Sequence, residues 1–212
     1  MTLLTEDPWA PAVPEDALRW FRGTSFRWWL AGGWAIDRVT GTSRPHADLD
    51  LAVLRAELPT VVRELSGWQL FEASRGELRL LSSQELPRPE VHGLWCRRPG
   101  ERVWMFELLI EESTVEASGE VTWLFRRDPR VRRALGSIVL RGACGLPIVA
   151  PEVQLLYKSK DPREKDERDF ARALPLLSTT ARTWLRENLD RVQPGHAWAA
   201  ELARGASGGV GR

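Results

Sequence analysis

Alternating apolar and polar positions predict strands in the first part of the chain. In the string HADLDLAVL, residues 46–54, the apolar residues Leu49, Leu51 and Val53 alternate with polar or small ones, which predicts a half-buried strand over residues 48–54. The apolar run of residues 26–31 predicts a strand before it. Similar runs predict strands at residues 68–73, 77–81, 94–97, 103–110, 121–125, 137–141 and 146–149. The pattern therefore predicts a sheet within the first 150 residues.

Helical spacing of apolar residues predicts helices between these strands and dominates the last third of the chain. Expected helices cover residues 16–23, 34–40, 59–65, 151–160, 163–174, 180–191 and 196–204. We therefore expect an α+β fold with a mixed-sheet domain at 1–150 and a helical domain at 151–205. Residues 206–212, ASGGVGR, have almost nothing to bury and are expected to be a disordered tail.

Two carboxylates stand on the alternating strand. Asp48 and Asp50 are two residues apart, and side chains at this spacing project from one face of a strand. They repel each other, and a pair of acids beside a buried strand is tolerated best when a cation neutralises it. Because paired oxygen ligands suit Mg²⁺, the spacing predicts a metal site at Asp48 and Asp50.

A Gly-Gly pair precedes this strand. Gly32 and Gly33 separate the apolar run 26–31 from the predicted helix 34–40, which ends at Gly41. The order of strand, glycine turn and helix directs the free N–H groups of the helix start toward whatever lies over the turn. We therefore expect Gly32 and Gly33 to bind phosphate.

These features, with Arg44 and His46, form one string, GGWAID followed by G, R and HADLD. The string resembles the nucleotidyltransferase superfamily that includes DNA polymerase beta, and it is most similar to the aminoglycoside and lincosamide nucleotidyltransferases. It is far more specific than Gly-Gly alone, because turn, helix length and D-x-D strand must coincide over about 20 residues. The resemblance implies a mixed β-sheet nucleotidyltransferase domain with flanking helices, a small C-terminal helical domain, and a cleft between them.

The resemblance also implies an enzyme that uses Mg²⁺ to transfer a nucleoside monophosphate, AMP from ATP, to a hydroxyl group. Asp48 and Asp50 would hold the metal. In this superfamily a third acid on a neighbouring strand completes the metal site, so the resemblance implies that catalytic role for Glu107. Family members more often carry Asp there, which leaves Glu111 and Glu112 as substitutes. From its sequence alone, Glu107 is a lone carboxylate in an apolar strand, so an ion pair with an arginine from an adjacent strand is the structural alternative.

Four more residues are candidates to bind the triphosphate. Arg44 and His46 would orient the aspartates or contact phosphate, and Lys158 and Lys165 would reach the phosphates across the cleft. Two of these have plainer interpretations. His46 is equally well a hydrogen-bonded edge histidine, and Lys165 is equally well part of a solvated helix face with i,i+4 pairs such as Glu164 with Arg168.

Charge refines the expected partners. Thirty Lys and Arg against 29 Asp and Glu give a net charge of +1, so nothing global indicates a nucleic-acid or membrane partner. Locally, residues 101–120 hold six acids against Arg102, an acidic rim that would attract a polycationic aminoglycoside. Residues 126–141 hold six arginines, which either face phosphates or are ordinary surface charge.

Composition fits a globular protein of the cytoplasm. With 212 residues, 43% of them hydrophobic and 11 of them Trp, the chain can fill a core. Cys96 and Cys144 lack CxxC or Cys/His spacing, which favours reduced thiols. We see neither a signal-peptide pattern nor an apolar run near the roughly 20 residues of a membrane span.

The expected acceptor is the hydroxyl of a small molecule, with an aminoglycoside-type antibiotic as the first choice. One alternative is a protein-modifying or antitoxin-type adenylyltransferase, which shares the metal site but modifies a protein. Another is a non-catalytic relative that binds nucleotide. The developed helical segment after residue 150 favours a small-molecule cleft, and the three acids favour catalysis.

Overall fold

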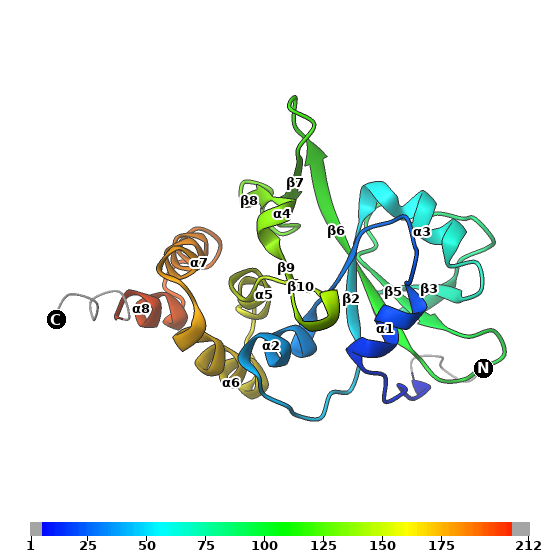
Figure 1. Ribbon diagram of the computed structural model, residues 1–212, viewed down its shortest axis with the longest axis horizontal. Helices are drawn as coiled ribbons and strands as arrows, with labels where there is room; N and C mark the ends of the chain where they lie inside the picture. The colour runs from blue at the N-terminus through cyan, green and yellow to red at the C-terminus, as the bar shows by residue number, and fades with distance from the viewer. Residues whose placement is uncertain (1–5, 205–212) are drawn as a thin grey trace.

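The computed structural model describes residues 6–204 (Figure 1). A mixed sheet occupies one half of the molecule, and the helices that follow it gather at the other side. The strand order is β4-β3-β5-β6-β2-β1-β10-β9, and β7 pairs with β6 and β8. The predicted α+β class is thus confirmed, whereas the predicted tail at 206–212 lies outside the described residues.

The strands near the centre of the sheet bring the predicted acids together. The central strands are β1 (Trp28–Leu30), β2 (Asp50–Leu54), β5 (Gly93–Arg97), β6 (Phe106–Val115) and β10 (Pro147–Val149), and the outer ones are β3 (Gln69–Ser74), β4 (Glu77–Leu80), β7 (Val121–Leu124), β8 (Arg132–Ala134) and β9 (Val139–Arg141). β2 runs parallel to β6 and antiparallel to β1, and β1 runs parallel to β10. The start of the D-x-D strand therefore lies beside the first residues of β6.

The predicted first strand, residues 26–31, is shorter in the structure. Only Trp28–Leu30 form β1, because two backbone N–H groups before it bond to side chains instead of a neighbouring strand. Ser25 donates to Glu64 at 2.9 Å and Arg27 donates to Glu57 at 2.6 Å. These contacts replace the sheet hydrogen bonds that a longer strand would need.

The predicted strand at 137–141 is wrong at its start. Leu135–Ile138 form the short helix α4, and only Val139–Arg141 form β9. Ser137 donates its hydroxyl to the carbonyl of Ala134 at 2.8 Å, which supports the helical turn. A four-residue helix is too short to show a 3.6-residue period, so the sequence pattern could not distinguish it from a strand. The three-residue strand β8 was missed because it is likewise too short to show an alternating pattern.

The longer helices are confirmed with small shifts at their ends. They are α1 (Pro14–Trp20), α2 (Gly32–Thr40), α3 (Leu58–Glu64), α5 (Pro151–Lys158), α6 (Glu164–Ala173), α7 (Thr179–Val192) and α8 (Ala197–Arg204). Helix α2 begins at Gly32 rather than Trp34 and ends at Gly41, whose φ of 68° closes the helix in the left-handed region that glycine favours. The Gly-Gly pair is thus the first turn of the helix.

The hydrophobic core continues from the sheet into the last helices. One cluster of buried residues extends from Ala17 to Leu202, so the predicted boundary near residue 150 stays a prediction. Phe170 on α6 stacks on Trp198 of α8 with ring centroids 4.4 Å apart, and the Trp198 indole donates to Glu167 at 2.7 Å. These contacts fix α6, which borders the cleft described next. Between residues 6 and 204, no helix is long and apolar enough to cross a membrane.

Candidate active site

The N-terminus of α2 lies next to the acidic strand. A Cβ built on Gly32 would overlap the carboxylate of Asp50, and one built on Gly33 would overlap Arg44 and come within 2.9 Å of His46. Both glycines are required for this close approach, and Gly32 also has a φ of +65°. The N–H of Gly32 donates to Gln154 of α5 at 2.8 Å. The glycine turn therefore contacts both the sheet and the last helices.

Three carboxylates gather where β2 and β6 begin. Asp50 and Glu107 are direct neighbours across the parallel strands, and Asp48 precedes Asp50 by two residues, with the buried Leu49 between them. Glu107 packs against a third glycine, since a Cβ on Gly93 would lie 2.5 Å from its Oε1. The backbone thus leaves room for two carboxylates that a side chain in either place would displace.

Two of these acids have pKa values well above the ordinary range. Burial raises the pKa of Asp50 to about 7, and the charge of Asp48 adds to the shift. Burial also raises the pKa of Glu107 to about 8, with further contributions from Asp50 and Asp48. Among the described residues Glu107 forms no ion pair, although the charge of Arg126 acts on it. The structural alternative, an arginine ion pair from an adjacent strand, is therefore wrong for Glu107.

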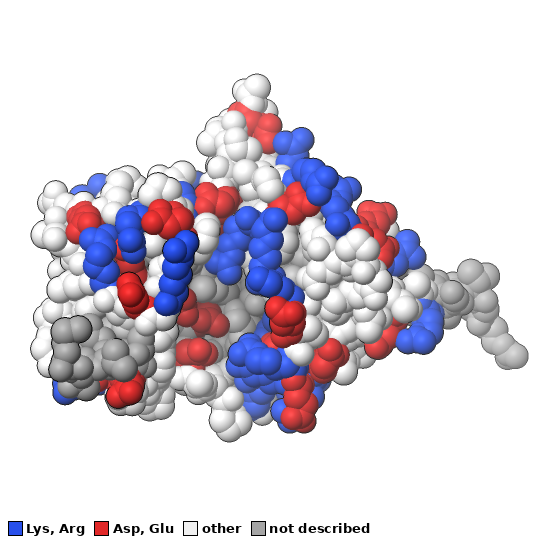
Figure 2. Space-filling view, turned by 180° about the vertical axis from the view of Figure 1, so that it is seen from behind, with Lys and Arg blue, Asp and Glu red and all other residues white. Residues whose placement is uncertain are grey.

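A cleft of about 400 Å³ opens over these carboxylates. Its lining includes all the residues that we predicted for the site, namely Gly32, Gly33, Arg44, His46, Asp48, Asp50, Glu107, Lys158 and Lys165. Figure 2 shows a hollow in the middle of this face with basic and acidic side chains crowded around it. The volume lies in the usual range for small-molecule sites. The lining carries acids on the sheet side and mainly basic side chains on the helical side.

The cations come from the helical side. Lys158 ends α5, and Lys165 lies in the first turn of α6. Their charges and that of Arg163 act on Asp50 and oppose the rise in its pKa. Lys165 is exposed, so its interpretation as part of a solvated face also stands, and the predicted pair of Glu164 with Arg168 is present at 3.6 Å.

Lys158 is held more tightly than we expected for a free phosphate ligand. Its ammonium lies 2.7 Å from Asp166 and 2.9 Å from Asp169, both on α6, and its side chain is 9% exposed. Burial alone would raise the pKa of Asp166, but hydrogen bonds from Lys158 and Arg163 lower it to about 2. Lys158 therefore lines the cleft as part of a buried ion-pair cluster.

Arg44 and His46 join a second set of contacts at the same helix start. His46 lies 2.8 Å from Asp37 through Nε2 and stacks on Trp34 with ring centroids 4.1 Å apart. The backbone N–H of Arg44 donates to Asp37 at 3.0 Å, and its guanidinium lies 3.2 Å from Asp169. His46 is thus a hydrogen-bonded histidine that also lines the cleft.

A smaller cavity of about 90 Å³ adjoins the cleft and contains Glu111. Glu111 Oε2 accepts hydrogen bonds from Trp123 at 2.7 Å and Tyr157 at 2.6 Å, and burial raises the pKa of its carboxyl group. Glu112 instead pairs with Arg55 at 2.6 Å. As a continuous strand requires, the two acids point to opposite faces.

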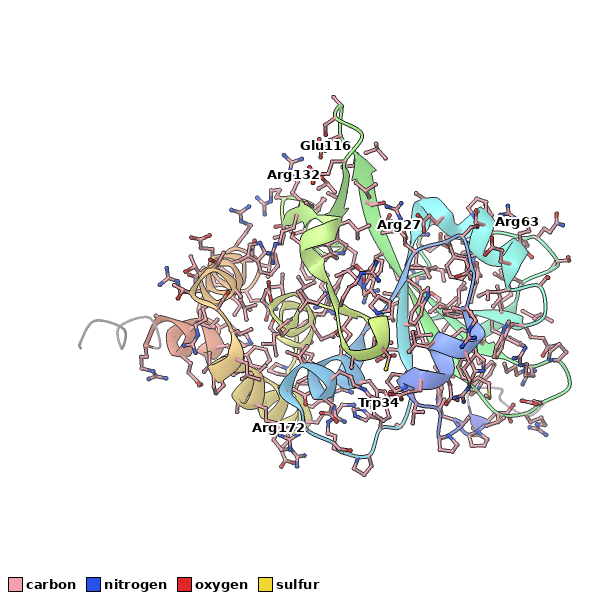
Figure 3. All side chains as sticks on the ribbon, in the orientation of Figure 1. Arg27, Trp34, Arg63, Glu116, Arg132 and Arg172 are labelled. Carbon is pink, nitrogen blue, oxygen red and sulfur yellow. The ribbon has the colours of Figure 1, made fainter. Side chains whose placement is uncertain are left out.

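The acidic rim is only partly present. Glu111 lies in the cavity beside the cleft, whereas Glu116 lies at the outer end of the β6–β7 hairpin, which projects away from the sheet (Figure 3). The acidic residues of this segment therefore do not lie together at one place. The hairpin leaves the sheet after Glu111 because β6 then pairs with β7 instead of β2.

Several residues of the cleft were not predicted from the sequence. Gln154, Asp166 and Asp169 contact predicted site residues, and Arg127 and Tyr157 line the cleft. One signal was available for the two aspartates, because residues three apart share a helix face. Gln154 carried no such signal, since its partner Gly32 is 122 residues away in the chain.

The mixed sheet, the glycine helix start and the acidic strand beside it are the features on which the sequence predicted a nucleotidyltransferase. More particularly, residues 15–87 match the family model for aminoglycoside-2''-adenylyltransferase. The matched stretch contains Gly32, Gly33, Asp48 and Asp50, so it confirms the resemblance on the residues that first indicated it. A search of curated proteins found no match.

Solved structures show the same fold over most of the chain. One is the lincosamide antibiotic adenylyltransferase LnuA with lincomycin bound, at 18% identity and a TM-score of 0.50 over 77% of this chain and 97% of that one. Another is ANT(2'')-Ia in complex with adenylyl-2''-tobramycin, at 16% identity and a TM-score of 0.50 over 84% of this chain and 95% of that one. At these identities the likeness concerns the fold.

Proposed function

We propose that this protein transfers AMP from ATP to a hydroxyl group of an aminoglycoside-type antibiotic, with Mg²⁺ as cofactor. The observation that carries the proposal is the contrast within one cleft. Three carboxylates without ion-pair partners among the described residues face Lys158 of α5, Lys165 of α6 and Arg163 just before α6. A triphosphate with its metal complements both sides, because phosphate oxygens need cations and the carboxylates need a divalent ion.

The donor set fits Mg²⁺. Asp48, Asp50 and Glu107 supply oxygen ligands only, and the glycines at 32 and 93 leave space for two of them. Within residues 6–204 no three His, Cys, Asp or Glu side chains are arranged as a metal-ligand set, so the fit to Mg²⁺ rests on the chemistry of these three oxygen donors. When bound, the metal would neutralise phosphate charge and lower the pKa of the attacking hydroxyl.

The protein's own residues would align the two substrates. The start of α2 would bind phosphate over Gly33, and Lys158 and Lys165 would bind the triphosphate from the opposite side. Glu107 would act as a metal ligand or accept the proton of the acceptor hydroxyl. The cavity with Glu111 supports an acceptor that carries an amino group, since a buried carboxylate attracts a cation.

The proposal is tested by incubating the protein with ATP, Mg²⁺ and a panel of aminoglycosides and lincosamides. Mass spectrometry should detect an antibiotic heavier by one AMP group, and the reaction should release pyrophosphate. In the absence of an acceptor, ATP with Mg²⁺ should raise the melting temperature more than ATP with a chelator.

Two outcomes would favour the rival functions. A protein that carries AMP as the only product would indicate a protein-modifying adenylyltransferase. Equal melting temperatures with and without chelator, together with the absence of any adenylylated product, would indicate a non-catalytic relative. A lincosamide modified in preference to every aminoglycoside would contradict the assigned acceptor and leave the reaction class intact.

A further inference from the structure

Asp169 is a fully buried carboxylate that contacts two of the cations assigned to phosphate. It lies on α6 and is 0% exposed. Its Oδ2 lies 3.2 Å from the guanidinium of Arg44 and 2.9 Å from the ammonium of Lys158. Arg44 belongs to the loop after α2 and Lys158 to the end of α5, so one oxygen atom joins three separate segments.

Two further buried polar atoms, one on Asp169 and one on Arg44, form no hydrogen bond of their own within residues 6–204. In the part of the chain that the structure describes, Asp169 Oδ1 and Arg44 Nε are buried without a hydrogen-bond partner. Asp169 therefore depends on Arg44 and Lys158 for its compensation. A buried carboxylate is costly when its cations move away, so Asp169 restrains both of them.

Both restrained cations, Arg44 and Lys158, lie where a phosphate at the glycine turn could be bound. The guanidinium of Arg44 packs directly against Gly33, and Lys158 borders the same cleft. Lys158 has three ammonium donors, of which one bonds to Asp166, and its ammonium also lies in ion-pair contact with Asp169. A cation held in this way keeps a donor for a phosphate without the entropy cost of ordering a free side chain.

We propose that Asp169 is a positioning residue that holds Arg44 and Lys158 together, so that they bind the polyphosphate of the nucleotide as one unit. The inference rests on the proposed function, because it assigns the polyphosphate to this cleft. It adds that a residue which need not touch the nucleotide determines the affinity for its phosphates. The nucleoside part of the substrate should not depend on Asp169.

The test compares Asp169→Asn with wild type by calorimetry, using inorganic tripolyphosphate, ATP and adenosine as probes. The substitution keeps the shape of the side chain and removes its charge. We expect tripolyphosphate and ATP to bind about tenfold more weakly, as loss of a charged hydrogen-bond partner typically causes, and adenosine affinity to stay unchanged. In turnover, the KM for ATP should rise more than kcat falls.

A matched control lies on the same helix. Glu164 is exposed and pairs only with Arg168 among the described residues, so Glu164→Gln should leave all three affinities unchanged. A folded Asp169→Asn variant with wild-type affinity for tripolyphosphate overturns the inference and leaves the proposed function intact. A wild-type protein that binds neither ATP nor tripolyphosphate overturns the proposed function, and the inference with it.

If Asp169→Asn does not fold, a double-mutant cycle on Arg44→Gln and Lys158→Gln answers the same question. Glutamine keeps a donor for Asp169 at both positions. Two cations held by one carboxylate should show coupled effects on the Kd for tripolyphosphate. The fold-increase in this Kd for the double variant should be at least about threefold smaller than the product of the fold-increases for the two single variants. Additive losses overturn the inference, because independent cations need no common anchor.

Discussion

The two sides of the cleft use charge in opposite ways. On the sheet side, Asp50 and Glu107 have raised pKa values of about 7 and about 8, caused first by burial and then by the charge of Asp48 on Asp50 and of both aspartates on Glu107. On the helical side, Asp166 has a pKa lowered to about 2, although burial opposes the shift, because Lys158 and Arg163 donate to it. Both sides of the cleft contain buried carboxylates. Among the described residues, those on the helical side form ion pairs with neighbouring cations, whereas Asp50 and Glu107 form none.

This difference separates two roles for a buried acid. A carboxylate with its counter-ions in place stabilises the arrangement of neighbouring elements, and its removal should affect folding first. A carboxylate without them is held at a cost to stability, and such a cost is typical of a functional site. The expected effects of substitution should therefore differ in kind between the two sides.

The largest expected effect is on the sheet side. Asp50→Asn should lower the turnover number by about 10³-fold or more, which corresponds to about 4 kcal/mol of activation free energy. The melting temperature should stay unchanged or rise, because one of three repelling charges is removed. Turnover with ATP and an aminoglycoside, together with calorimetric melting, measures both quantities.

Asp190→Asn is the matched control for this experiment. Asp190 is exposed on α7, so its substitution should change neither quantity. A folded Asp50→Asn variant with normal turnover would place the metal site elsewhere. A large fall in its melting temperature would show that Asp50 has a stabilising partner, which would remove the contrast between the two sides.

The next largest effect is on the helical side. Lys158→Met should lower the free energy of unfolding by about 3 kcal/mol, because Asp166 and Asp169 then lose their shared buried cation. Denaturant unfolding followed by tryptophan fluorescence measures the loss. The control is Lys160→Met, since Lys160 is exposed and forms no ion pair among the described residues. Equal stability of the two variants would contradict a stabilising role for the cluster.

Acid should remove part of this stability in a defined pH range. The pKa of Asp166 is about 2 in the folded protein against an ordinary value of 3.8, so the unfolded chain binds its proton more tightly. The resulting contribution of about 2 kcal/mol is complete above pH of about 4 and is lost as pH falls through about 2. Wild type and Asp166→Asn should thus differ at neutral pH and converge near pH 2.

The measurement is denaturant unfolding of both proteins at several pH values. A difference that stays constant between neutral pH and pH 2 would mean that Asp166→Asn acts through packing rather than charge. Asp190→Asn again serves as control, and its stability should follow that of wild type throughout.

The smallest effect concerns the space around Glu107. Gly93→Ala would place a Cβ 2.5 Å from Glu107 Oε1, so the carboxylate must turn away from its place beside Asp50. We expect turnover to fall about tenfold, or about 1.4 kcal/mol, with a melting temperature close to that of wild type. Gly136→Ala is the control, because its Cβ meets no atom within 4 Å. Normal turnover for Gly93→Ala would argue against a role for Glu107.

The sequence predicted the sheet side of the site better than the helical side. Gly32, Gly33, Asp48 and Asp50 lie within one short string, so local spacing alone indicated that they act together. Glu107 stood out as a lone carboxylate in an apolar strand, and the family resemblance implied its role. The register now places it directly beside Asp50 on the neighbouring strand. These patterns lie within short stretches of sequence, so they can be recognised without knowledge of the fold.

The helical side depends on contacts between distant segments. Arg44 and Asp169 are 125 residues apart, and nothing near either residue indicates the other. Asp166 and Asp169 were hidden within a run of charges that is equally typical of a solvated helix face. The short elements α4 and β8 were missed for a related reason, since they are defined by tertiary contacts and are too short to show a period.

The hydrogen bond from Gly32 to Gln154 bears on the order in which this protein matures during synthesis. The glycine turn emerges from the ribosome early, but its partner on α5 follows 122 residues later, and the parallel partner of β1 at Ile148 is almost as late. The nascent chain must therefore wait for β10 and α5 before the glycine turn beside its repelling aspartates has its partners. A ribosome stalled before α5 should carry a chain unable to retain nucleotide, however well its early strands have paired.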